Sequence, residues 1–303
     1  MVASIEQPGA ERIPPTIDGI SGIALEIHDL AAGRAFYELL FEAAGGEWET
    51  TRRSLTFRSA GQRVELVRSR RPRTNAHAGY HVAFRVPARR LSRIVEALAK
   101  AGHTVEWWRE DHPAEREPTA YVKDPSGNIV QLVRSEDDGL IDHVGIPVES
   151  IEEAEVFYTL ALGGQLDGYY GWTTEHVMEG RAWATGDDPC APWTRNAYVS
   201  FRTHKPTPSP AAQIYARFGT TYAAIYLTGQ RLAEPPEEQL EGTPRIILRS
   251  PHSADIAAAR LSDVRASAVR LTYDGGKVRF EQEGRDLFVR DRCGNFIQIA
   301  CDG

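Results

Sequence analysis

An internal repeat restricts the fold of this chain more than any other feature of its sequence. Residues 124–132 read DPSGNIVQL and residues 291–299 read DRCGNFIQI, so both follow the pattern Asp-x-x-Gly-Asn-x-x-Gln. An Asp and a Gly at this spacing indicate a tight turn that leads into a strand. Such repetition is typical of a fold that uses one supersecondary unit several times.

Two further pairs of segments show the same duplication. Residues 23–40 parallel residues 144–161, and each segment predicts a short strand followed by a helix with a Phe-Tyr pair. Residues 80–98 parallel residues 244–261. Four apolar side chains of residues 80–98 are spaced to share one helix face: Leu91, Ile94, Val95 and Leu98. The predicted order is a strand, a helix and about three strands, used four times.

The repeat divides the chain into two halves of unequal length. We expect a flexible arm over residues 1–17, a first domain over residues 18–136 and a second domain over residues 140–303. The polar residues 135–139 form the predicted linker between the domains. The extra length of the second half is expected in residues 171–195 and 204–243, which are rich in Pro, Gly and Thr. Each half is predicted to form one compact domain with its own sheet.

Composition excludes several classes of function. The chain has 303 residues, of which 42% are hydrophobic and 25% charged, and a formal net charge of −7. A net negative chain lacks the cationic face that nucleic acid or an anionic membrane requires, so neither is an expected partner. Three cysteines make no disulfide framework, and no apolar run has the length of a membrane span. The sequence starts with no signal-peptide pattern, and we expect a cytoplasmic protein.

Paired βαβββ units that end in an Asp-x-x-Gly-Asn strand resemble the vicinal oxygen chelate superfamily. This group includes glyoxalase I, bleomycin-resistance proteins and extradiol dioxygenases. The resemblance covers about residues 20–135 and 141–301. It implies an α+β fold in which tandem units pair into two cupped mixed sheets, with the family's metal held inside the cup by residues of the first and last strands. Because the superfamily hosts unrelated chemistries, the site residues must decide the function.

The positions that the family uses as metal ligands are only partly filled in the first half. Gly22 stands where the family has His or Gln, and Glu65 stands at its carboxylate position. His81 occupies a ligand position, and Gln131 replaces the usual Glu. Glu65, His81 and Gln131 are therefore candidates for substrate binding. Whether Glu65 and His81 hold a metal ion with the help of water or a borrowed group stays open.

The second half keeps one imidazole. His143 stands at the first ligand position and Tyr226 at the second, whereas Arg245 replaces the second His and Gln298 replaces Glu. Arg stays protonated in proteins and cannot bind a metal. We expect no metal in either cup. The four residues should instead converge as a catalytic set, with His143 as general acid and base and Arg245 holding an oxygen.

Aromatic residues in the longer second half suggest walls for a planar ligand. Tyr170, Trp172 and Trp193 are the substrate-binding candidates, although they could equally cover the outer face of a sheet. The arginines of residues 67–77 could clamp the phosphate of a nicotinamide cofactor, but no Gly-rich phosphate-binding turn accompanies them. No cofactor is assigned; NADPH is the one alternative considered.

These features favour a metal-independent tailoring enzyme of bacterial secondary metabolism. It would act on an oxygen-rich, polyketide-like aromatic molecule as a lyase or cyclase, by dehydration or ring closure, with NADPH-dependent reduction as a variant. Two alternatives remain open at this stage: a protein that sequesters an antibiotic, and a divergent metal-dependent extradiol-type dioxygenase. A homodimer is also left open. Metal analysis with and without a chelator separates these hypotheses.

Overall fold

The computed structural model describes most of the predicted elements. The described residues are 17–42, 44–72, 81–108, 119–136, 139–148, 151–171, 201–203, 211–227, 244–259, 281–283, 286–291 and 295–302. No helix among them is long and apolar enough to cross a membrane.

The elements follow one another as four successive units. Unit 1 contains β1 (Gly19–Ile27), α1 (Leu30–Phe41), β2 (Glu47–Thr50), β3 (Ser54–Ser59) and β4 (Gln62–Arg68). Unit 2 contains β5 (His81–Val86), α2 (Ala88–Lys100), β6 (Val105–Trp108), β7 (Thr119–Lys123) and β8 (Ile129–Arg134). Unit 3 contains β9 (Ile141–Val148), α3 (Ile151–Glu155) with a π-helical continuation (Val156–Ala161), β10 (Gln165–Gly171), β11 (Phe201–Thr203), β12 (Ala211–Phe218) and β13 (Thr221–Leu227). Unit 4 contains β14 (Arg245–Ser250), β15 (Glu281–Glu283), β16 (Asp286–Arg290) and β17 (Phe296–Cys301).

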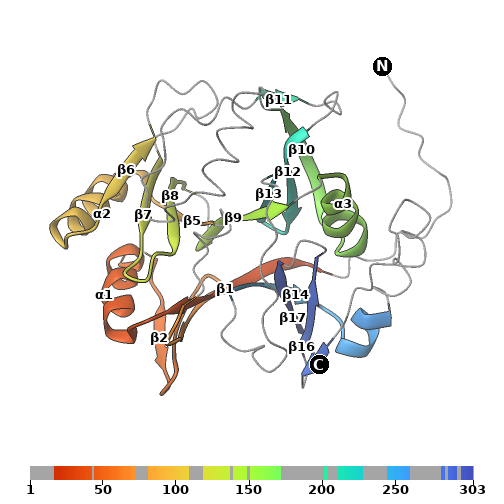
Figure 1. The fold of residues 1–303 in the computed structure, drawn as a ribbon, viewed down its shortest axis with the longest axis horizontal. Helices are drawn as coiled ribbons and strands as arrows, with labels where there is room; N and C mark the ends of the chain where they lie inside the picture. Colours follow the sequence, from red (N-terminus) through yellow and green to blue (C-terminus); the bar gives the residue numbers. More distant parts are fainter. Residues whose placement is uncertain are drawn as a thin grey trace.

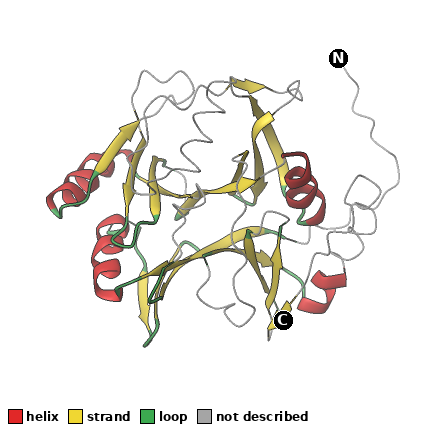
Figure 2. Cartoon of the chain, viewed as in Figure 1, coloured by secondary structure: helices red, strands yellow, loops and turns green. Residues whose placement is uncertain are grey.

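These units pair into two curved sheets. Sheet A has the order β15-β16-β17-β14-β1-β4-β3-β2, and sheet B has the order β11-β10-β12-β13-β9-β5-β8-β7-β6. In Figure 1 sheet B curves open toward the top and sheet A toward the bottom, with α1 and α2 on one flank and α3 on the other. Figure 2 shows the same two layers, with the helices outside the curved sheets. The predicted fold class, α+β with paired βαβββ units in two mixed sheets, is confirmed.

The pairing of units differs from the prediction. Sheet A joins unit 1 to unit 4 through the antiparallel pair β1 and β14, and sheet B joins unit 2 to unit 3 through β5 and β9. Each sheet therefore takes one unit from each half of the chain, and the expectation that each half makes its own sheet is wrong. The first strand of every unit needs a partner strand, and local sequence does not specify which unit supplies it.

The repeated Asp-x-x-Gly-Asn motif holds each half together by other contacts. Asp124 accepts hydrogen bonds from the backbone N–H groups of Ser126 and Asn128, at 2.8 and 2.9 Å, and from the Tyr37 hydroxyl of α1 at 3.1 Å. The Asn128 amide donates to the Glu26 carbonyl of β1. Burial and the nearby Asp124 raise the pKa of Tyr37 well above its ordinary value, so its hydroxyl stays a donor.

The second copy of the motif repeats this arrangement. Asp291 accepts from the backbone of Asn295 at 2.9 Å and from the hydroxyl of Tyr158 at 3.0 Å. The Asn295 amide donates to the Pro147 carbonyl. The tyrosine of each predicted Phe-Tyr pair thus attaches the helix of one unit to the turn before the last strand of the next unit.

Parts of two segments that were expected to be irregular belong to the folded core. Ile17, assigned by sequence to the flexible arm, is 2% exposed, while residues 1–16 lie outside the described part of the chain. Residues 211–227, assigned to an insertion, form β12 and β13 in the middle of sheet B. Most of the other predicted insertion, residues 172–195, lies outside the described residues.

Candidate functional site

Two histidines face each other on the hollow side of sheet B. His81 of β5 and His143 of β9 bring their Nε2 atoms to 3.0 Å, with the ring planes at 88°. Along β5, Val82 and Phe84 are buried in the core cluster, so the alternation of strand residues turns His81 and Ala83 toward the opposite face. Sequence placed these two imidazoles in different sites, and the structure brings them together.

Strand register and two small residues create room for this pair. Ala83 lies opposite Gln131 on one neighbouring strand and opposite His143 on the other, so its small side chain separates two polar ones. His81 lies opposite Gly145, and a Cβ added at Gly145 would be 2.4 Å from His81 Nδ1. The imidazole of His81 therefore occupies the space that the missing side chain of Gly145 leaves.

A β-bulge adds an acid to the histidine pair. The register between β5 and β9 shifts at Asp142, because Ala83 pairs with His143 while Phe84 pairs with Ile141. A bulge can turn two successive side chains to the same side of a strand. Asp142 Oδ2 lies 2.8 Å from His143 Nδ1, and its Oδ1 lies 3.1 Å from Nε of Arg85. The two neighbours thus occupy both carboxylate oxygens.

The charge of Asp142 sets the direction of the hydrogen bonds. Burial alone would raise the pKa of Asp142, but hydrogen bonds and charges from His143 and Arg85 together hold that pKa below its ordinary value. The ionised carboxylate accepts a hydrogen bond from the N–H group at His143 Nδ1, which leaves His143 Nε2 as the acceptor toward His81 when His143 is neutral. We assign Asp142, His143 and His81 as one relay on this basis.

Tyrosines line the same face of sheet B. Tyr226 and Tyr121 have ring centroids 6.1 Å from that of His81, and Tyr215 lies 6.4 Å from His143. Tyr222 is paired in register with His143 and contacts Tyr215 at 6.1 Å. Aromatic rings of this kind offer stacking surfaces and hydroxyl groups to a planar ligand.

Gln131 completes the cup of sheet B. It is 5% exposed and donates from Nε2 to the Thr119 hydroxyl at 3.0 Å. Its Oε1 is buried without a hydrogen-bond partner among the described residues. A buried acceptor without a partner costs stability, so this oxygen is a candidate contact for a ligand in the cup.

The cup of sheet A holds a different set of polar residues. Arg245 of β14 donates from Nε to Gln298 Oε1 at 2.6 Å and from Nη2 to Glu65 Oε2 at 3.0 Å. The other oxygen of Glu65 lies 2.8 Å from Nε of Arg63, and the Gln298 amide donates to Asp286. Glu65 and Gln298 thus both pair with the Arg245 guanidinium, and Glu65 forms a second ion pair with Arg63.

The predicted catalytic set is therefore divided between the two sheets. His143 and Tyr226 lie in sheet B with His81 and Gln131, whereas Arg245 and Gln298 lie in sheet A with Glu65. The expectation that His143 and Arg245 share one cup is wrong, because unit 3 pairs with unit 2 and unit 4 pairs with unit 1. Trp172 and Trp193 lie outside the described residues, and Tyr170 is described only as part of β10.

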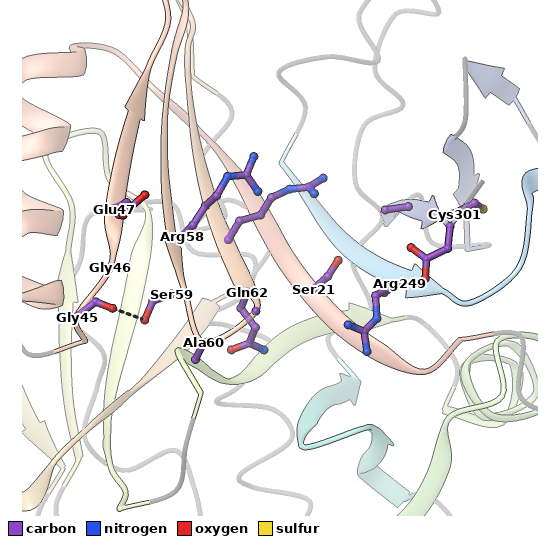
Figure 3. Close-up of a pocket in the computed structure, with 14 residues that line it drawn as sticks. Ser21, Gly45, Gly46, Glu47, Arg58, Ser59, Ala60, Gln62, Arg249 and Cys301 are labelled. Atoms are coloured by element: carbon purple, nitrogen blue, oxygen red, sulfur yellow. Dashed lines mark hydrogen bonds between the residues drawn. The ribbon is translucent and has the colours of Figure 1, made fainter.

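A hollow of about 560 Å³ opens on sheet A near the turn between β3 and β4. Figure 3 shows Arg58, Ser21 and Arg249 around it, with Ser59 bonded to the carbonyl of Gly45 on one side. None of the residues that line it is a histidine. Its three arginines, Arg58, Arg63 and Arg249, are already paired with Glu49, Glu65 and Asp18, respectively. This hollow therefore offers no imidazole for acid–base chemistry, whereas the cup of sheet B contains two.

The two cups fit a metal ion differently. In sheet A the Arg245 guanidinium fills the space between Glu65 and Gln298, and its permanent charge does not fit a cation site. In sheet B, two imidazole Nε2 atoms and the carbonyl of Gln131 are donors that a transition metal accepts. No group of three His, Cys, Asp or Glu side chains suited to a metal occurs among the described residues. A metal in sheet B would therefore need an amide or phenol oxygen in place of a carboxylate.

Sequence reasoning missed Asp142, Ala83 and Gly145. Asp142 directly precedes His143, and adjacent residues of a regular strand point to opposite faces, so only the bulge makes it a partner. Ala83 and Gly145 contribute to the site because their small size leaves room for the polar side chains. This role can be recognised only once the strand register is known. The pairing of β5 with β9 was the missing signal.

Comparison with known proteins supports the fold and the family. A sequence model of the Glyoxalase/Bleomycin resistance protein/Dioxygenase superfamily matches residues 140–299. Glyoxalase I from Zea mays is similar in structure with a TM-score of 0.59 at 14% identity, over 93% of this chain and 92% of that chain. A Bacillus subtilis protein provisionally described as a dioxygenase has a TM-score of 0.56 at 11% identity, over 95% and 86% of the two chains.

No curated protein sequence matches this chain. The similarity to solved structures establishes the fold alone, since identities are low. The family model covers more than half of the chain, including β9 with His143 and β17 with Gln298. The chain therefore belongs to the Glyoxalase/Bleomycin resistance protein/Dioxygenase superfamily.

Proposed function

We propose that the protein is an enzyme that performs acid–base chemistry in the cup of sheet B on an oxygen-rich aromatic molecule. The observation that carries this proposal is the relay of Asp142, His143 and His81, with contacts of 2.8 and 3.0 Å. Imidazoles are the usual acids and bases near neutral pH. The surrounding tyrosines favour a planar substrate, and dehydration or ring closure, as in the tailoring of polyketides, is the reaction class that the relay suits.

The relay supplies one acid and one base when the two imidazoles share one extra proton. His81 is then the positively charged imidazolium, and its Nε2–H group donates to Nε2 of the neutral His143. His143 in turn donates from Nδ1 to Asp142, and the negative carboxylate stabilises the positive charge across the His143 ring. A substrate oxygen that enters the cup replaces His143 as the acceptor of this proton. His143 Nε2 is then available to remove a proton from the substrate.

A dehydration balances on these two groups. His143 Nε2 takes the proton from a substrate carbon, the electron pair forms the new double bond, and the hydroxyl leaves as water with the proton of His81. His143 is now protonated at Nε2 and His81 is not. Once the product leaves, the 3.0 Å contact returns the proton from His143 to His81 and restores the starting state.

Substitution of the two histidines tests this proposal. General acid–base catalysis contributes about 10²–10⁴-fold in rate, so His81→Gln and His143→Gln should each lower kcat by about that factor. The assay would follow absorbance changes in a panel of hydroxylated aromatic ketones. His28→Gln removes an exposed imidazole outside the cup and is the matched control. Unchanged kcat in both cup variants would contradict the proposal.

The assay also separates finer alternatives. Ligand binding by the wild-type protein without turnover would favour an antibiotic-sequestering protein. Turnover that consumes NADPH in proportion to product would establish a coupled reduction. Light scattering of the same preparation determines whether the protein works as a homodimer.

A metal-dependent enzyme is the second candidate, favoured by the 3.0 Å separation of the two Nε2 atoms and by the Gln131 Oε1 atom, which has no hydrogen-bond partner in the described part of the chain. His81, His143 and Gln131 would hold the ion, which would polarise a substrate oxygen. Asp142 would then fix His143 in the tautomer that a metal ligand requires. Elemental analysis separates the candidates: one tightly held transition metal per chain, with activity lost to a chelator, favours the metal-dependent enzyme.

A further inference from the structure

The two sheets place different residues at equivalent positions. In sheet B, His81 lies opposite Gly145, and Gln131 and His143 flank Ala83. In sheet A, Arg245 lies opposite Ala24, and Gln298 and Gly22 flank Ile247. Arg245 therefore occupies the register position of His81, Gln298 that of Gln131, and Gly22 that of His143. The cups share a backbone plan but differ in side-chain chemistry.

Arg245 is fixed at the centre of the sheet A cup. Arg245 is 7% exposed. Its guanidinium passes over the small Ala24 to contact Glu65, and it also contacts Gln298 on the other side. Glu65 is occupied on both oxygens, by Arg245 at 3.0 Å and by Arg63 at 2.8 Å. The carboxylate that could bind a metal already has two cationic partners.

We propose that Arg245 is a built-in cation of sheet A, which ties units 1 and 4 together and prevents this cup from binding a divalent metal. An ion beside Glu65 would meet a guanidinium that cannot lose its proton. The same guanidinium connects β4, β14 and β17, and Gln298 extends the connection to Asp286 of β16. Sheet A is thus a structural cup, and this conclusion does not depend on which reaction sheet B performs.

Metal titration tests the exclusion directly. The background is the full, untagged chain with His81→Ala and His143→Ala, which removes the imidazoles of sheet B. Isothermal titration with Ni²⁺ should detect no site of one equivalent in this background. Adding Arg245→His leaves Glu65 and Gln298 beside a new imidazole, and this variant should bind one equivalent of Ni²⁺ and melt at a higher temperature in its presence.

Matched substitutions separate the roles of charge and donor. Arg245→Met removes the cation without supplying a ligand, so it should bind no Ni²⁺ and should lower Tm by several degrees, because Glu65 loses a buried partner. Adding Glu65→Gln to the Arg245→His variant should abolish its Ni²⁺ site. These measurements need no substrate.

Several results would overturn the proposal. One equivalent of Ni²⁺ bound by the background and lost on Glu65→Gln would show that Arg245 does not exclude metal. A folded Arg245→His variant that binds no Ni²⁺ would contradict the same claim. An unchanged Tm for Arg245→Met would contradict the structural role. If Arg245→His does not fold, the titration of the background still decides whether sheet A takes a metal.

Discussion

At the scale of single residues, the geometry of the histidine pair depends on a residue without a side chain. Gly145 lies beneath His81, and an added Cβ would come within 2.5 Å of two ring atoms. Such a contact requires the imidazole to move. Because the relay needs His81 Nε2 at hydrogen-bond distance from His143, a shift of even about 1 Å should reduce turnover strongly.

We therefore expect Gly145→Ala to lower kcat at least tenfold while the protein remains folded, as measured by steady-state kinetics and circular dichroism. Gly19→Ala is the matched control, since a Cβ at Gly19 of β1 meets no atom within 4 Å. Equal kcat in the two variants would show that the position of His81 is unimportant for the reaction.

Asp142 predicts a pH dependence of stability. Its pKa is lowered in the folded state, since the hydrogen bonds and charges of His143 and Arg85 outweigh burial. A carboxyl group with a lowered pKa stabilises the fold above its unfolded pKa, and that contribution is lost as the pH falls through the folded value. The stabilisation should be complete at neutral pH and decline below about pH 4.

Urea unfolding of the wild-type chain and Asp142→Asn at several pH values tests this expectation. The difference in the free energy of unfolding should be largest near neutral pH and shrink as the pH falls from about 5 toward 3. A difference that stays constant over this range would exclude an ionised Asp142 as the source of the stabilisation.

The residues of the cups were largely predictable, but their grouping was not. Sequence selected five of these residues because each stands at a metal-ligand position of the family that the chain resembles: His81, His143, Gln131, Tyr226 and Arg245. Their assignment to common sites depended on the pairing of strands far apart in the chain. Asp142 lacked any such signal, because only the register shift beside it turns its carboxylate toward His143.

At the scale of elements, the spacing that the two copies of the repeat share forms the turn before β8 and before β17. Asp124 and Asp291 each bind the backbone of their own turn and a buried tyrosine of a preceding helix. Tyr37 and Tyr158 are 0% and 1% exposed. Removal of one hydroxyl leaves a buried carboxylate with one donor fewer.

Tyr37→Phe should therefore lower the free energy of unfolding by about 1–3 kcal/mol, with Tyr158→Phe similar. Chemical denaturation at neutral pH measures both. The effects should add in the double variant, because the two tyrosines share no hydrogen-bond partner. An unchanged free energy in either single variant would show that its turn does not need the tyrosine.

Helices were easier to predict than the strands of unit 3. The apolar spacing of α2 predicted its buried face, and Leu91, Ile94, Val95 and Leu98 are all buried there. β12 and β13 were assigned to an insertion, because residues 204–243 combine Pro and Gly with little periodicity. These strands lie inside sheet B, and their side chains Ile214, Ala216 and Ile225 pack into the core on the helix side of the sheet. Their strand structure therefore depends on these core contacts and not on the flanking sequence.

At the scale of the whole molecule, strands of the two halves of the chain pair with one another in both sheets. Each sheet crosses from one half to the other, and the buried Gln62 adds a further connection. Its amide donates to the Ile20 carbonyl and the Thr221 hydroxyl, while its oxygen accepts from the backbone of Leu140 and Ile141. The length of the chain and its repeat predicted two domains, but they did not indicate which units would pair their first strands.

The pairing of strands between the two halves leads to a specific prediction for the isolated first half. A chain of residues 18–136 retains β1 and β5 but loses their antiparallel partners β14 and β9, so both strands expose an unpaired edge. We expect no folded monomer. The available solution is a homodimer in which β1 of each copy pairs with β5 of the other.

Light scattering and thermal unfolding of this half-chain measure the outcome. The dimer should melt cooperatively at a temperature that rises with protein concentration, because dissociation accompanies unfolding. Mixing with residues 139–303 should replace homodimers by a one-to-one complex in which unit 1 again pairs with unit 4. A monomeric half-chain with a cooperative, concentration-independent transition would show that each half folds by itself and that the sheets join only after the halves have formed.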